Sequence, residues 1–232
     1  MAVTKIPAMT DPTQLETLQA ILQEHAVPKF FDRVELIDDG TAEGLRVGCY
    51  VGDRLFLEIY GYILGTSSDY GLIVHTKDGN TTQLWAGYGS GGWVESVYVC
   101  GGGLLLTANS QPQNTVAITK TASGGTAVQV YTNDRTSTRH GGPAGVHSTE
   151  SYYGLWAISS EDETPAPYNV YFNNVDSVAG RCALCPIYTG QDSLQHAWQP
   201  LQRQFAEVAA PLEVEMDGKR YLVNRGIVIL DA

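Results

Sequence analysis

Residues 45–131 show short runs in which apolar and polar positions alternate, and these runs are separated by turns rich in glycine. The clearest pair of runs is 71–76 and 81–85, which flank the sequence Lys77-Asp78-Gly79-Asn80. Asp-Gly between two β-prone runs is a strong signal for a hairpin turn. We therefore predict that antiparallel hairpins are the repeating unit of this fold.

The same alternation extends over most of the remaining chain. In residues 54–60 the aliphatic positions alternate with aromatic and acidic ones, which predicts one face toward a core and the other toward water. The chain is expected to be mainly β, an antiparallel β-sandwich or barrel-like domain with a short N-terminal α-helix. The predicted strands cover residues 30–37, 45–51, 54–60, 71–76, 81–85, 93–100, 104–108, 116–120, 126–131, 152–159, 168–175, 181–188, 212–216 and 220–230.

The helix is predicted over residues 12–24. Asp11 has the character of an N-cap, Pro12 suits the first helical position, and Gln14 can complete a capping box. An apolar stripe follows at helical spacing, formed by Leu15, Leu18, Ile21 and Leu22. A single amphipathic helix beside a β domain serves either as a lid on an open sheet or as a contact with a neighbouring subunit.

These elements predict two parts in the chain. Residues 1–28 form an N-terminal arm and helix, and residues 29–232 form the antiparallel β domain. Residues 133–151 resemble a long loop and residues 161–167 an acidic linker, and a division of the β domain is compatible with either position. A second short helix is expected near residues 200–208.

The net charge of the chain limits the kinds of molecule that it is expected to bind. The 232 residues include 14 basic and 25 acidic side chains, for a formal net charge of −11. A field of that sign repels phosphate backbones and anionic membrane surfaces, so nucleic-acid binding is not expected. The sequence contains neither a secretory signal nor an apolar run of membrane-spanning length, and synthesis in a cytoplasm without membrane insertion is expected.

The four cysteines offer the first candidate site. Cys182 and Cys185 have a spacing that can hold two zinc ligands, but Cys49, Cys100 and the histidines supply no second pair at ligand spacing. Small apolar core residues are the favoured interpretation of these cysteines. We therefore predict no metal and no cofactor.

Catalytic residues can be proposed only as loose groups. Cys100, His75 and Asp78 contain the residue types of a nucleophilic triad, and Glu58 with Glu95 is the best available pair for glycoside cleavage. No nucleophile elbow, zincin helix or peptidase signature accompanies them. The sequence thus favours a protein that is not an enzyme, with no catalytic residues.

Aromatic side chains are the more informative set. Those close to predicted turns can bind a sugar at the rim of a β-sandwich, although the same residues also fill cores and subunit interfaces. The alternative function is thus a carbohydrate-binding or host-adhesion module. Its candidate residues are Tyr60, Tyr62, Tyr88, Trp93 and Tyr98.

Two segments carry a resemblance to a protein family: Phe31-Asp32-Arg33-Val34-Glu35-Leu36 after the helix, and the terminal hairpin from Gly218-Lys219-Arg220-Tyr221-Leu222-Val223-Asn224 to Ile229-Leu230-Asp231. With the β series between them, they resemble small virion proteins encoded among the tail and structural genes of phages and prophages of Gram-positive gut bacteria. The resemblance implies a repeated structural subunit, located in the virion and made in the host cytoplasm. Its implied partners are copies of itself and other virion proteins, with a host surface glycan as a further possibility. The candidate interface residues are Leu15, Leu18, Leu22, Tyr221, Ile227 and Ile229.

Overall fold

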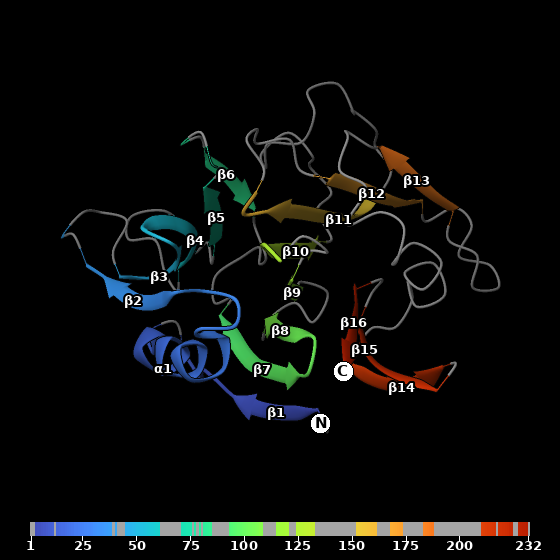
Figure 1. The fold of residues 1–232 in the computed structure, drawn as a ribbon, viewed down its shortest axis with the longest axis horizontal. Coiled ribbons are helices and arrows are strands. Elements are labelled where there is room, and N and C mark those ends of the chain that lie inside the picture. The colour runs from blue at the N-terminus through green and yellow to red at the C-terminus, as the bar shows by residue number, and fades with distance from the viewer. Residues whose placement is uncertain are drawn as a thin grey trace.

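The structure is a computed structural model of the chain. It describes residues 3–11, 13–38, 40, 45–60, 71–75, 77, 79, 81–84, 93–108, 115–120, 124–132, 152–161, 168–173, 183–187, 210–216, 218–224 and 227–231. These residues form one helix and three antiparallel sheets, which we name A, B and C (Figure 1).

Sheet A is the largest of the three sheets. Its strands are, in spatial order, β1 (Thr4–Pro7), β7 (Val94–Cys100), β8 (Gly103–Ala108), β9 (Thr115–Lys120), β10 (Thr126–Thr132), β11 (Tyr152–Ser159), β12 (Tyr168–Asn173) and β13 (Ala183–Ile187). Sheet B contains, again in spatial order, β2 (Arg33–Ile37), β3 (Arg46–Val51), β4 (Arg54–Tyr60), β5 (Gly71–His75) and β6 (Thr81–Leu84). Sheet C contains β14 (Leu212–Met216), β15 (Lys219–Asn224) and β16 (Ile227–Asp231), and the helix α1 spans Leu15–Ala26.

Sheet A is also the middle layer of the molecule. On one face, Leu104 and Leu106 of β8 belong to a large hydrophobic cluster that also includes α1 and sheet B. On the opposite face, Leu105 packs in a second cluster with Ile227 and Ile229 of sheet C. Successive side chains of a strand point to opposite faces, so three consecutive leucines are buried because both faces of β8 are covered.

The contact between sheets A and C is close at Gly103. A Cβ atom built on this residue would lie 2.5 Å from the carbonyl oxygen of Ile118 and 3.1 Å from Cγ2 of Ile229. Glycine therefore leaves room for the backbone of β9 beside β8 in sheet A, and a Cβ here would also press on Ile229 of β16. Both marked chain ends lie on this side of the molecule (Figure 1).

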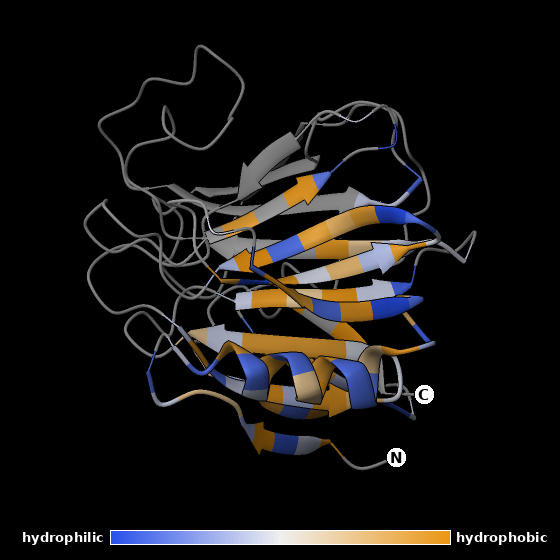
Figure 2. Ribbon diagram, turned by 90° about the vertical axis from the view of Figure 1, so that its left-hand side faces the viewer, coloured by the Kyte–Doolittle hydropathy of each residue, from blue (hydrophilic) through white to orange (hydrophobic). Residues whose placement is uncertain are grey.

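The helix α1 covers one end of the main cluster. Leu18 and Leu22 are fully buried, and α1 packs against β2, β3 and β7. The amide of Gln19 also donates a hydrogen bond of 3.0 Å to the carbonyl oxygen of Val34 on β2. Figure 2 shows hydrophilic and hydrophobic residues alternating along the helix, as the apolar stripe in the sequence predicts.

The start of α1 differs from the prediction. The helix begins at Leu15 and ends at Ala26, instead of covering residues 12–24. Asp11 accepts hydrogen bonds from the backbone N–H of Thr13 at 2.9 Å and from its hydroxyl, and therefore stabilises the turn before the helix. Gln14 reaches back to the backbone N–H of Thr10 at 2.9 Å, one residue earlier than the capping box predicted.

The predicted fold class is confirmed: the described chain is mainly β, its sheets are antiparallel and sandwich-like, and it has one helix. The 71–76 and 81–85 hairpin forms as β5 and β6, with Gly79 in its turn at a φ of +86°. The strand β1 is absent from the predictions because it has only four residues and ends in proline.

Two further expectations concern the sheets. The wet face predicted for residues 54–60 is wrong, since Phe56, Glu58 and Tyr60 are all buried. Residues 133–151 and 200–208 lie outside the described residues. The strands that flank residues 133–151 and 162–167 are hydrogen-bonded neighbours, β10 with β11 and β11 with β12, so sheet A continues across both segments.

Candidate functional site

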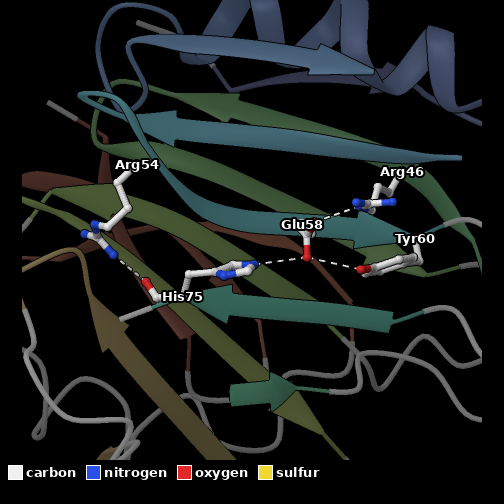
Figure 3. A network of polar contacts seen from close by, with 5 residues as sticks. All are labelled: Arg46, Arg54, Glu58, Tyr60 and His75. Atoms are coloured by element: carbon white, nitrogen blue, oxygen red, sulfur yellow. Dashed lines mark hydrogen bonds and ion pairs between the residues drawn. The ribbon is translucent and has the colours of Figure 1, made fainter. Parts of the chain in front are cut away.

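The most concentrated polar chemistry among the described residues lies in sheet B. We name Arg46, Glu58, Tyr60 and His75 the Glu58 cluster (Figure 3). Arg46 comes from β3, Glu58 and Tyr60 come from β4, and His75 ends β5. These three strands are direct neighbours, so the cluster crosses the centre of one sheet.

A β-bulge brings the cluster together. Next to the turn, Val51 pairs with Arg54 and Tyr50 pairs with Leu55, but beyond the bulge Cys49 pairs with Leu57. One extra residue of β4, Phe56, is thus inserted into the ladder, and every later pair is shifted by one position. A one-residue shift moves a whole strand to the other face, so the bulge determines which β3 side chains share a face with Glu58.

The shifted register places polar side chains together on one face of β4 and aliphatic side chains together on the other. Arg46 lies opposite Tyr60, which places it on the same face as Glu58. The aliphatic residues Leu57 and Ile59 lie opposite Cys49 and Val47 on the core face, and all four are fully buried.

Glu58 is the centre of the contacts. Its Oε1 accepts a hydrogen bond of 2.7 Å from Nε of Arg46, and the same atoms form an ion pair. Its Oε2 lies 3.0 Å from Nε2 of His75 and accepts a hydrogen bond of 3.1 Å from the Tyr60 hydroxyl. The side chain of Glu58 is 6% exposed, that of Arg46 is 11% exposed, and that of His75 is 22% exposed.

These contacts determine the protonation of the carboxyl group. Burial, the largest single influence, raises the pKa of Glu58, but the hydrogen bonds to His75, Arg46 and Tyr60 and the charge of His75 together lower it below its ordinary value. Glu58 is therefore ionised at neutral pH, with both oxygens engaged by neighbours. A carboxylate in this state is suited to holding strands together and poorly suited to donating a proton.

Arg54 extends the polar contacts from sheet B to sheet A. Its guanidinium donates one hydrogen bond to the backbone carbonyl of His75 and another, of 2.6 Å, to the carbonyl of Ser160, which follows β11. Partial burial lowers the pKa of Arg54. The arginine thus fixes the end of β5 against the middle layer of the molecule.

The catalytic candidates do not come together. His75 is engaged by Glu58 in sheet B, whereas Cys100 lies in the cluster between sheets A and C and its thiol contacts the carbonyl of Gly103 at 3.4 Å. Glu95 is exposed on β7, while Glu58 is buried in its cluster, and Asp78 lies outside the described residues.

The remaining cysteines give no metal site in the part of the chain that is described. Cys49 is fully buried on β3, and this burial raises the pKa of its thiol. Cys185 lies on β13, and Cys182 is outside the described residues. Within the described ranges, no group of three or more histidine, cysteine, aspartate or glutamate residues is placed to hold a metal ion.

The aromatic candidates have different positions. Tyr60 is 2% exposed and bonded to Glu58. Trp93 packs on the main cluster, whereas Tyr98 packs on the second cluster with the Lys5 ammonium 5.6 Å from its ring centre. Tyr62 and Tyr88 are outside the described residues, and sugar binding by this set stays a prediction.

The candidate interface residues are mostly in the core of the chain itself. Leu15, Leu18 and Leu22 are buried in the main cluster, where the lid interpretation places them. Ile227 and Ile229 are buried against sheet A, and Tyr221 is half-buried. A contact between subunits through these residues stays a prediction.

Two arginines complete the polar network without having been predicted. Arg46 is the second residue of the predicted strand 45–51, Arg54 begins the predicted strand 54–60, and neither belongs to a motif, so only the structure shows that one contacts Glu58 and the other Ser160. No family model, curated protein or solved structure matches this chain. Among the described residues, no helix has the length and apolar character needed to cross a membrane.

Proposed function

We propose that this protein is a non-enzymatic structural subunit that acts through contacts with other proteins, in a phage particle or a phage-tail-like assembly. The observation that carries the proposal is a contrast between the polar residues in the interior of sheet B and the edge of sheet C. The side chains of the Glu58 cluster hold strands together, while an edge strand of sheet C has no hydrogen-bonded neighbour on its outer side among the described strands.

The exposed strand is β14. It pairs only with β15 among the described strands, and Leu212 at its start is 52% exposed, although most large apolar side chains of the described chain are buried. An unpaired strand edge is a common place for one protein to add a strand from another. This arrangement suits a building block better than a catalyst.

The virion assignment rests on the resemblance of the sequence. Most of the residues that carry it lie in β2 and in the hairpin of β15 and β16. In this proposal the partners are copies of the chain and other virion proteins, and the location is the virion. The aromatic alternative has less support, because Tyr60 is buried while Trp93 and Tyr98 pack on different clusters.

Particle fractionation tests the proposal. Particles released from cells that carry the gene in its native context are separated on a density gradient, and the chain is detected in each fraction with an antibody. We expect it to sediment with the particles and to remain there after a high-salt wash. Its presence in the soluble fraction alone would contradict a structural role in the virion.

A further inference from the structure

The edge strand β14 (Leu212–Met216) has an unusual distribution of side chains. Glu213 and Glu215 are exposed, as is Leu212, while Val214 is half-buried. Its backbone pairs with β15 on one side, and no described strand pairs with its other side. Within the described part of the chain, β14 is therefore a sheet edge whose backbone donors and acceptors can pair with an added strand.

The register with β15 divides these side chains between two faces. Glu213 lies opposite Leu222 and Glu215 lies opposite Arg220, so both acids project from one face of sheet C. The apolar Leu212 and Val214 project from the other face. An added strand would meet two carboxylates on one face and two apolar side chains on the other.

A second copy of β14 is a poor occupant of this edge. In an antiparallel pair centred on Val214, each Glu213 faces the Glu215 of the other copy. Moving the centre by one residue along the strand places one glutamate opposite its own copy. Directly opposed like charges destabilise a sheet, and the net charge of −11 adds general repulsion between copies.

We propose that the β14 edge binds an extended segment of a different protein, with lysine or arginine at alternate positions and apolar residues between them. Charge complementarity supports this occupant, because its basic side chains would face Glu213 and Glu215 while its apolar side chains extend the face of Leu212 and Val214. The inference rests on the proposed function, since it names the kind of partner that such a subunit takes.

A peptide-binding experiment tests the inference with the full chain. The probe is a fluorescein-labelled peptide of sequence Thr-Val-Lys-Val-Lys-Val-Thr, and its counterpart carries glutamate in place of both lysines. Fluorescence anisotropy is measured at physiological salt. We expect the lysine peptide to bind at least about ten times more tightly than the glutamate peptide, since two charge pairs change from attractive to repulsive.

Charge-reversal variants locate the binding site. The double variant Glu213→Lys with Glu215→Lys should reverse the preference between the peptides. The matched control is Glu16→Lys with Glu24→Lys, which makes the same change in net charge on the exposed side of α1 and should keep the original preference. Circular dichroism verifies that each variant is folded.

Three outcomes would overturn the inference. They are equal binding of the two peptides, an equal response of both double variants, and no binding of either peptide; the last would leave Glu213 and Glu215 as charges that only keep the edge from pairing. Particle fractionation is independent of these results. A chain found in particles that does not bind the lysine peptide removes the edge inference alone, whereas a chain absent from particles removes the proposed function.

Discussion

Replacing Glu58 by glutamine should strongly destabilise the fold. The substitution keeps the shape of the side chain but removes the negative charge that three neighbours contact. The most affected neighbour is Arg46, whose side chain is only 11% exposed and whose Nε lies 2.7 Å from the carboxylate. Without that charge, the Arg46 guanidinium would lose its 2.7 Å ion pair with Glu58 in the interior of the protein.

The expected size follows from the burial of this pair. Removing one member of a buried ion pair costs about 3–5 kcal/mol, because the other charge is left uncompensated. Glutamine retains an oxygen that can accept a hydrogen bond from Arg46, so the lower part of this range applies. We expect Glu58→Gln to lower the free energy of unfolding by about 3 kcal/mol.

Urea unfolding at pH 7, followed by tryptophan fluorescence, measures this loss. The matched control is Glu95→Gln, an exposed glutamate on β7, which should change stability by less than about 0.5 kcal/mol. In an Arg46→Met background, Glu58→Gln should cost less than in the native chain, because the ion pair with Arg46 is already lost. A Glu58→Gln protein as stable as the control would refute the stabilising role of the Glu58 carboxylate.

Three further predictions follow from the same structure. The pKa of Glu58 is lowered from its ordinary value of 4.5. The stability that the ionised carboxylate contributes is therefore complete above pH 4.5 and is lost as the pH falls through the lowered value. In urea titrations at several pH values, the native chain should lose stability more steeply in acid than the Glu58→Gln variant. Gly103→Ala should cost about 1–3 kcal/mol in the same assay, since the new Cβ meets the backbone of β9; Gly52→Asn, at a turn with open space and a φ of +60°, should cost less, and equal losses would contradict the close packing. Leu18→Ala should lower the free energy of unfolding, measured by thermal denaturation, by about 2–5 kcal/mol because the side chain is fully buried. Gln23→Ala, on the exposed side of α1, should change this free energy by less than about 0.5 kcal/mol.

The local part of this fold could be predicted from the sequence. Alternation and turn residues located most of the strands within a few residues, because both depend on neighbours in the chain. The arrangement of the sheets in layers could not be predicted in this way. Three consecutive leucines at 104–106 are compatible with several kinds of buried segment, and only the structure shows a sheet on each side of β8.

The Glu58 cluster shows why the site was harder to predict. A two-residue turn at Gly52 and Asp53 without a bulge would place Val47 opposite Glu58 and would put Arg46 on the other face. The bulge at Phe56 reverses this arrangement, and no turn residue or motif marks its position. His75 lies 17 positions from Glu58 in the sequence and reaches it only because β5 is the next strand of the sheet.

The middle position of sheet A has a consequence for how this chain can vary. At Leu104 a change of volume disturbs the layer formed with sheet B, and at Leu105 the adjacent position disturbs the layer formed with sheet C. Substitutions at two neighbouring positions are therefore limited by packing against two different sheets. In a library of random variants selected for folding, β8 should accept the fewest substitutions, and most accepted diversity should collect at the perimeter of the sheets.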